Sequence, residues 1–377
     1  MNSKFKNISA LLPLSYMLVL AVLLGLAGCS KDSKKEETRP TDPNVEKLDS
    51  YVKNLTALRD TSVYGTYTGM YPQESKEILT PVISEANKLI LLIKYGDTPP
   101  SHADIEQCYV KLEKAGTDFK ASKRTEDAVI PAELFVNGMN GGYIDFGSSP
   151  EYSVFGNPGS QQFTVETWFK FTNINGFGAA ITTFYENGGS RVRKGWMINH
   201  FDNQRLRMSY SMSAYDNMLE PGADLPMSGF GNTWVHFAAV YNDNGFNGER
   251  DGNGNLIVIK VYRNGELVST ATKRNSSDKY VGNDLPISMT AFLEIRSDGS
   301  TTRKIAGYIK DFHIWKTAKT AVEINQLKNK EIIVSGTETD LACGWDFSKT
   351  VRDDNNIRDL TGRHSARLIG EHRWDLK

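Results

Sequence analysis

The stretch Phe163-Thr164-Val165-Glu166-Thr167-Trp168-Phe169-Lys170-Phe171 (FTVETWFKF) indicates the fold class of the long C-terminal part of the chain. Its apolar residues recur at every second position, which is the period of a β-strand with one buried face. Residues 234–241 (WVHFAAVY) and 256–263 (LIVIKVYR) are also strand-like. Asn264-Gly265 separates the latter run from ELVST (266–270) and predicts a type I′ hairpin, in which both central residues take positive φ. These patterns predict antiparallel strands.

Further short strand-like runs, joined by turns rich in Gly, Asn and Asp, occur at residues 143–146, 196–201, 206–210, 292–295 and 305–315. Many short strands with such turns favour a two-sheet antiparallel β-sandwich, which we place at residues 129–377. A short helix is expected at residues 321–328, with Thr320 and Glu323 forming its capping box. We expect Trp168, Trp234, Trp315 and Trp345 to lie in the core.

The apolar period is helical in residues 41–128. One helix is expected to begin at Pro43, a second to span residues 72–95, and a third to begin at Ser101. Their short connections predict a three-helix bundle. The loop at residues 64–72 is rich in Tyr and Gly, and it either packs over the end of the bundle or forms a binding surface.

Residues 1–28 have the three parts of an export signal, namely a basic start, an apolar stretch and a small-residue cleavage site. The tetrapeptide Leu26-Ala27-Gly28-Cys29 resembles the lipobox of bacterial lipoproteins, which implies that Cys29 is acylated and becomes the first residue. Residues 29–40 lack apolar side chains after the cysteine and predict a disordered tether. We expect an outer-membrane protein that is held only by its lipid anchor and faces the cell exterior. The alternative is an uncleaved membrane anchor.

Charge and composition exclude several classes of protein. The 377 residues carry 44 Lys and Arg against 45 Asp and Glu, so no basic field favours nucleic acid. A mean hydropathy of -0.42 argues against a polytopic membrane protein. Removal of residues 1–28, which contain Lys4 and Lys6, would leave 42 basic and 45 acidic residues, a net charge of -3. Cys108 and Cys343 are expected to be isolated buried thiols.

The segments YIDFG (143–147), FTVETWFK (163–170), WVHFAAVY (234–241), KVYRNGELV (260–268) and GYIKDFHIW (307–315) occur in an order that resembles the laminin-G-like branch of the concanavalin A-like lectin and glucanase fold. The closing segments GWDF (344–347) and DLTGRH (359–364) are similar to that branch as well. The resemblance covers residues 133–377 and implies a jelly roll. The helical segment resembles small modules that precede ligand-binding domains in bacterial surface lipoproteins. Since this fold hosts lectins, hydrolases and adhesion modules, function needs separate evidence.

We expect no catalytic site. Glucanases of this fold use the motif E-x-D-x-x-E, and both E-x-D pairs of this chain lack its last glutamate, with Gly254 and Cys343 in that position. Serine-elbow, zincin, phosphate-loop and C-x-x-C motifs are absent from the sequence. His236 and His313 lie in apolar strands, and we expect them to be residues of the core or of a sheet face whose ring nitrogens have hydrogen-bond partners within the protein.

A sugar site needs an aromatic face for the pyranose ring and planar polar groups for its hydroxyls. Such groups lie before the strand at Trp196 and in the loop 211–230, and our candidate ligand-binding residues are Tyr185, Glu186, Asn187, Arg191, Arg193, Tyr215, Asp216 and Asn217. Phe184 is a further aromatic residue of the first group. The polar loop 242–255 offers hard oxygen ligands, so calcium is the possible cofactor, with Asp243, Asp251, Asn253 and Asn255 as candidate ligands; a polar hairpin insertion is the alternative.

The sequence therefore favours a non-catalytic surface lipoprotein whose sandwich binds glycan. The alternatives are an adhesion or assembly module with a protein partner, and a glycoside hydrolase with displaced carboxylates.

Overall fold

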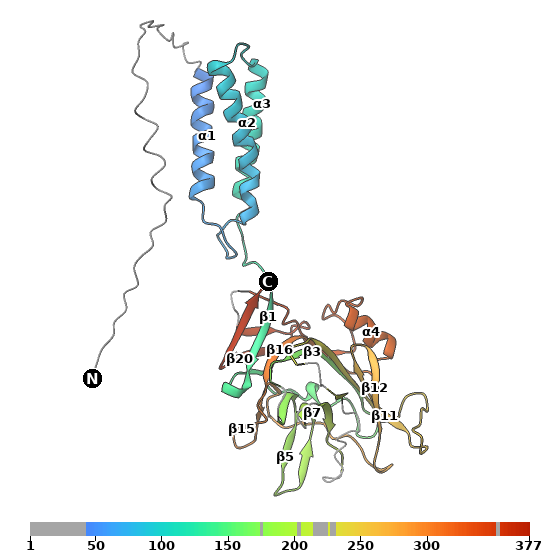
Figure 1. Ribbon diagram of the computed structural model, residues 1–377. Coiled ribbons are helices and arrows are strands. Elements are labelled where there is room, and N and C mark those ends of the chain that lie inside the picture. Colours follow the sequence, from blue (N-terminus) through green and yellow to red (C-terminus); the bar gives the residue numbers. More distant parts are fainter. Residues whose placement is uncertain (1–42, 174–175, 202–204, 214–224, 227–230, 352–354) are drawn as a thin grey trace, which may run out of the picture. The chain divides into compact units, whose positions relative to one another are not determined.

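The computed structural model describes residues 43–173, 176–201, 205–213, 225–226, 231–351 and 355–377 (Figure 1). The chain divides into two compact units. One unit contains the chain up to Thr61 together with Glu74–Ala121, and the other contains Ser62–Gln73 and Ser122–Lys377. The predicted signal segment, the tether and Cys29 lie outside the described residues. In the described ranges, no helix has the length and apolar character needed to cross a membrane.

The first unit is the predicted three-helix bundle. It consists of α1 (Pro43–Thr61), α2 (Lys76–Tyr95) and α3 (His102–Ala121), and the 3-10 turn η1 (Gln73–Ser75) leads into α2. Leu48, Leu79, Leu112 and Phe119 are fully buried, and they come from the apolar stripes of all three helices. The second helix begins at Lys76 instead of residue 72, because residues 73–75 form the 3-10 turn.

The Tyr- and Gly-rich loop between α1 and α2 pairs with the segment that follows α3. Gly69 N donates to the carbonyl of Arg124 at 2.9 Å, and Arg124 N donates back to Met70. The Asp127 carboxylate accepts hydrogen bonds from the backbone N–H and the hydroxyl of Thr68. The loop is therefore grouped with the second unit, and whether it packs over the end of the bundle or forms a binding surface stays a prediction.

The second unit is built from two antiparallel sheets. The nine-stranded sheet has the order β12-β11-β10-β3-β16-β1-β18, with β17 paired to β16 and β21 to β1. Its strands are β1 (Ile130–Asn137), β3 (Gln162–Phe171), β10 (Val235–Asn242), β11 (Ile257–Arg263), β12 (Glu266–Thr272), β16 (Ala306–Trp315), β17 (Leu341–Trp345), β18 (Lys349–Thr350) and β21 (His372–Leu376).

The eight-stranded sheet has the order β19-β20-β2-β13-β4-β7-β8-β9. Its strands are β2 (Tyr143–Asp145), β4 (Gly178–Thr182), β7 (Trp196–Phe201), β8 (Arg205–Tyr210), β9 (Leu225–Pro226), β13 (Thr290–Ala291), β19 (Asn356–Arg358) and β20 (Ser365–Ile369). Two 3-10 turns, η2 (Gly138–Asn140) and η3 (Pro150–Tyr152), flank β2. The predicted fold class, a helical bundle followed by an antiparallel sandwich, is confirmed.

The core lies between the sheets and follows the alternation of β3. Phe163, Val165 and Phe169 are fully buried in it, together with Trp345. Trp315 is also buried, in a smaller cluster with Leu327 and Leu341. Burial of apolar surface stabilises such a core by about 25 cal/mol per Å².

Trp168 and Trp234 do not lie in the core, and the prediction for these two residues was wrong. In β3, Val165 and Phe169 face the core, so Glu166 and Trp168 point to the opposite face of the sheet. Trp234 lies two residues before His236, which is paired with Trp168, and therefore points to that same face. Both indoles are therefore half-buried on the outer face of the nine-stranded sheet.

The predicted turn and helix signals are present. Asn264 and Gly265 have φ of 50° and 84°, as a type I′ turn requires. Thr320 is the N-cap of helix α4 (Ala321–Asn329), and its side chain forms the capping box with Glu323. Ile324 of α4 packs with Tyr262 of β11, so α4 covers part of the outer face of the nine-stranded sheet (Figure 1).

Candidate functional site

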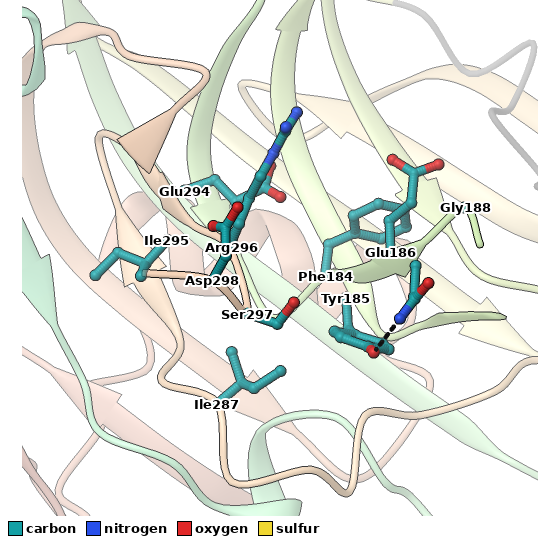
Figure 2. Close-up of a pocket in the computed structure, with 11 residues that line it drawn as sticks. Phe184, Tyr185, Glu186, Gly188, Ile287, Glu294, Ile295, Arg296, Ser297 and Asp298 are labelled. Carbon is teal, nitrogen blue, oxygen red and sulfur yellow. Dashed lines mark hydrogen bonds between the residues drawn. The ribbon is translucent and has the colours of Figure 1, made fainter. Parts of the chain in front are cut away.

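Two short hairpins border a hollow of about 430 Å³ at the eight-stranded sheet. One hairpin pairs β5 (Tyr185–Asn187) with β6 (Val192–Lys194), and the other pairs β14 (Glu294–Ile295) with β15 (Thr301–Thr302). Figure 2 shows Tyr185, Glu186 and Gly188 on one side of the hollow and Ile295, Arg296, Ser297 and Asp298 on the other. Its size lies in the range of small-ligand sites.

The two hairpins lie close together because they extend from neighbouring strands. β4 and β13 pair antiparallel, with Thr182 opposite Thr290. The chain leaves β4 through Phe184 into β5, and it leaves β13 through Phe292 into β14. Phe292 has a φ of 71°, which bends the chain, so that the strand predicted at residues 292–295 is shortened to β14.

Arg303 joins the two hairpins. Its guanidinium contacts the carboxylate of Glu294, and its Nη2 lies 3.5 Å from Oε2 of Glu186. The same guanidinium lies 4.7 Å from the ring centre of Phe177 and 5.6 Å from that of Phe184, so aromatic faces hold it in place. Arg303 therefore fixes one carboxylate from each hairpin beside the hollow.

The carboxylates of the site differ in environment. Burial raises the pKa of Glu294, although Arg303 acts in the opposite direction. Hydrogen bonds from the hydroxyl and the backbone N–H of Ser300 lower the pKa of the exposed Asp298. The Glu186 carboxylate accepts a 2.8 Å hydrogen bond from Nε of Arg193, which helps to hold the carboxylate in position.

Two groups at the hollow remain available to a ligand. The guanidinium of Arg296 makes no hydrogen bond or ion pair with another residue in the described ranges, and Arg296 is exposed. The Tyr185 ring is half-buried, and its hydroxyl accepts a 3.3 Å hydrogen bond from the side-chain amide of Asn187 (Figure 2). An aromatic face, an amide, carboxylates and a guanidinium are the groups that sugar recognition requires.

The structure brings together part of the predicted ligand-binding set. Tyr185, Glu186 and Asn187 line the hollow, while Arg193 acts through Glu186. Arg191 lies in the turn of the β5–β6 hairpin with a φ of 51°. Tyr215, Asp216 and Asn217 lie outside the described residues. The predicted loop before Trp196 is therefore a hairpin, and Phe184 at its base is buried.

Sequence reasoning missed the opposite wall of the hollow, which comes from residues 294–298 and Ile287. The segment Ser297-Asp298-Gly299 was a usable turn signal, since Gly299 takes a φ of 80°. Nothing in the sequence indicates that this turn lies opposite Tyr185, because more than a hundred residues separate them.

The candidate calcium ligands hold hydrogen bonds within the protein. Asp243 is buried and contacts the hydroxyl of Tyr241 at 2.6 Å and Nζ of Lys273 at 2.8 Å. Asp251 accepts hydrogen bonds from the backbone N–H groups of Asn253 and Asn255 in its own turn. In the described part of the chain, no group of three or more His, Cys, Asp or Glu is arranged to hold a metal ion. Calcium in this loop stays a prediction.

The carboxylates of the two E-x-D pairs also make structural contacts. Glu249 contacts Lys260, and Asp340 contacts Lys319 and Thr317. Glu338 accepts hydrogen bonds from Ser335 and Gly336.

Cys108 and Cys343 are both buried, and neither forms a disulfide.

Two family models match the chain. Residues 139–325 match the concanavalin A-like lectin/glucanases superfamily, so the chain carries a concanavalin A-like domain. Residues 43–123 match a domain of unknown function (DUF4972). No curated protein matches the chain.

Several solved structures are similar to part of the chain. A Bacteroides ovatus protein assigned to carbohydrate binding is 17% identical with a TM-score of 0.40, and the alignment covers 66% of this chain and 61% of that protein. The chain therefore spans about three-fifths of the length of that relative.

The CBM40 module of the Ruminococcus gnavus IT-sialidase, bound to α2,3-sialyllactose, is 15% identical with a TM-score of 0.35, over 53% of this chain and 98% of the module. The binding domain of botulinum neurotoxin serotype G is 13% identical with a TM-score of 0.32, over 54% of this chain and 46% of that chain. Similarity at this level does not transfer a ligand to this chain.

Proposed function

We propose that this chain is a non-catalytic, lipid-anchored surface protein that binds glycan in the hollow between the β5–β6 and β14–β15 hairpins. The observation that carries the proposal is that the Tyr185 ring lies on one wall of the hollow and Arg296 on the other. The guanidinium of Arg296 makes no ion pair or hydrogen bond with the residues that the structure describes. The ring offers an apolar face to a pyranose, and the guanidinium donates hydrogen bonds to its hydroxyl or acidic groups.

Preorganisation supports the same ligand class. Arg303 holds Glu186 and Glu294 in place before any ligand arrives, so the site does not have to order these carboxylates on binding. Carboxylates fixed in this way accept hydrogen bonds from sugar hydroxyls.

The decisive experiment is a glycan array followed by calorimetric titration of the best ligand. We expect Tyr185→Ala and Arg296→Gln each to weaken binding about tenfold, which corresponds to about 1.4 kcal/mol. Tyr95→Ala is the matched control, because Tyr95 is 77% exposed and lies in the helical unit. No array signal, or a signal that neither hollow variant reduces, would refute glycan binding in this hollow, and retention of a protein partner in pull-downs would then favour the adhesion alternative.

The absence of catalysis has its own test. We expect a panel of polysaccharides to release no products on incubation with the protein. Product release that a single Asp or Glu substitution abolishes would instead support the hydrolase alternative.

The lipid anchor is proposed from the signal-like residues 1–28 and from Cys29. Intact-mass measurement of the membrane-extracted protein should show the loss of residues 1–28 and an added acyl mass, and Cys29→Ala should remove both changes. Protease accessibility on whole cells tests the outward orientation.

A further inference from the structure

The outer face of the nine-stranded sheet has a second group of aromatic and basic side chains, separate from the hollow. α4 covers one part of this face, and beyond α4 the strands β1, β3 and β16 and the start of β10 carry half-buried rings and cations. We call this group the outer-face patch; it comprises the half-buried side chains of Trp168, Lys170, Trp234, Tyr308 and Lys310 and the buried ring of Phe135 beside them. Antiparallel pairing of these strands places the six side chains on one surface.

Cations lie over the rings of the patch. Nζ of Lys310 is 3.9 Å from the ring centre of Trp234 and 5.9 Å from that of Trp168. Nζ of Lys170 is 3.9 Å from the ring centre of Tyr308. These cation–π contacts hold the ammonium groups at the surface of the sheet.

The charges on this face are not balanced. Glu133 contacts both Lys170 at 2.7 Å and Lys377 at 3.0 Å, so it is already matched by two cations. Asp311 pairs with Lys330, and Asp375 pairs with Arg373. Lys310 makes no ion pair or hydrogen bond with any residue that the structure describes, and burial lowers its pKa.

A half-buried ammonium group without a counter-ion is unfavourable, because it has lost part of its hydration without gaining a carboxylate. A bound anion would restore that interaction. Beside Lys310, the Trp168 indole borders a cleft of about 150 Å³ whose rim carries the ion pairs Asp311–Lys330 and Asp346–Lys349. An apolar ring face next to an unmatched cation suits a sugar that bears an acidic group.

We propose that the outer-face patch binds an acidic polysaccharide, with Lys310 pairing with a carboxylate or sulfate group of the chain and Trp168 packing against a sugar ring. The patch is open and extends over neighbouring strands, which suits a chain better than an isolated anion. Its occupancy does not depend on the hollow, because it shares no residue with that site.

The test is binding of the full-length protein to polygalacturonate, with neutral dextran as the comparison, by affinity electrophoresis and calorimetry. We expect polygalacturonate to bind, dextran to bind at least tenfold more weakly, and the polygalacturonate affinity to fall as salt is raised. Lys310→Gln and Trp168→Ala should each weaken polygalacturonate binding about tenfold. Lys310→Arg keeps the charge and should stay within about threefold of the unmodified protein.

The controls separate this proposal from its rivals. Lys279→Gln changes an exposed lysine elsewhere in the unit and should leave binding unchanged. Lys310→Gln should leave the affinity for the best glycan-array ligand unchanged, whereas Tyr185→Ala should weaken it, so failure at the hollow and failure at the patch are distinguishable. Melting curves of each variant, read by tryptophan fluorescence, exclude loss of fold as the cause.

Several outcomes would overturn the proposal. Equal binding of dextran and polygalacturonate, or full polygalacturonate binding by folded Lys310→Gln, would show that Lys310 recognises no acidic group. Binding to phosphatidylglycerol vesicles in place of polygalacturonate would assign the patch to a lipid surface. A dimer that Trp168→Ala dissociates, without polysaccharide binding, would assign it to a second copy of the chain.

Discussion

Nε2 of His236 lies 2.8 Å from Oε2 of Glu166, and both side chains are buried on the outer side of the nine-stranded sheet. The other oxygen of the same carboxylate contacts Nδ1 of His313. Pairing of β3 with β10 and β16 places the three side chains together. Burial alone would raise the pKa of Glu166, but the charge of His313 and the hydrogen bonds from both histidines outweigh it and lower the pKa to about 2.

Glu166→Gln should destabilise the sandwich by about 3 kcal/mol. The substitution replaces one carboxylate oxygen with an amide NH2 group, which cannot accept a hydrogen bond from a histidine N–H. Glu266→Gln is the control, since Glu266 is exposed on β12 and its replacement should change stability by less than about 0.5 kcal/mol. Urea unfolding followed by tryptophan fluorescence is specific to this unit, because all 6 tryptophans lie in it. Equal unfolding midpoints for the two variants would contradict the prediction.

The same cluster should make stability depend on pH. Burial acts to lower the pKa of His313, but Glu166 outweighs it and raises the pKa above the usual value. The contribution of His313 is therefore complete below about pH 6.5 and is lost as pH rises through its raised pKa. The contribution of Glu166 is complete above about pH 4.5 and is lost as pH falls toward 2.

We thus expect the cluster to stabilise the sandwich most between about pH 4.5 and 6.5. The melting temperature of the unmodified protein should decrease between pH 6 and pH values above 8. His313→Gln should have a lower melting temperature at pH 6 and a smaller decrease over the same pH range. A variant whose slope matches that of the unmodified protein would show that His313 does not cause it.

Two glycines of the turn after β1 should respond differently to alanine. A Cβ at Gly138 would lie 2.0 Å from the carbonyl oxygen of Phe292, so Gly138→Ala should displace backbone and cost about 3 kcal/mol. Gly141 has a φ of 82° and open space around its Cβ position, so Gly141→Ala should cost only the backbone strain, about 1 kcal/mol. Chemical unfolding measures both, and the reverse order would argue against the close approach of Phe292.

Arg303→Gln should loosen both hairpins of the hollow. The substitution removes the cation that contacts the buried Glu294 carboxylate. Loss of one partner of a buried ion pair costs about 3 kcal/mol of stability. Arg193→Gln removes a contact to the half-buried Glu186 and leaves the Arg303–Glu294 pair intact, so it should cost less. Glycan affinity should fall more in Arg303→Gln than in Arg193→Gln, and similar affinities in the two variants would mean that Arg303 does not position the site.

Alternation and turn chemistry were sufficient to predict most of the fold. The period of two in β3 and the Asn264-Gly265 turn are local properties, and local periodicity reports which face of an element is buried. The capping box at Thr320 is local in the same way. The half-buried position of Trp168 is also present in the alternation, since Trp168 shares parity with Glu166, but its apolar character favoured the core.

The candidate site was only half predictable. Tyr185, Glu186 and Asn187 were identified from their residue types, yet Arg296 and Glu294 come from a hairpin distant in the sequence. The pairing of β4 with β13 brings the two hairpins together, and strand order in a sandwich is set by packing of the whole core. The same holds for the Glu166 cluster, whose three members come from three strands.

The sequence by itself therefore determined the helical and β units, the strand period, the turns and one wall of the hollow, because each depends on residues close together in the chain. Only the tertiary structure decided which side chains face one another: Arg303 between two hairpins, Lys310 over Trp234 without a carboxylate, and Glu166 between two histidines. Those contacts join residues far apart in sequence, so they exist only once long-range strand pairing has placed them side by side.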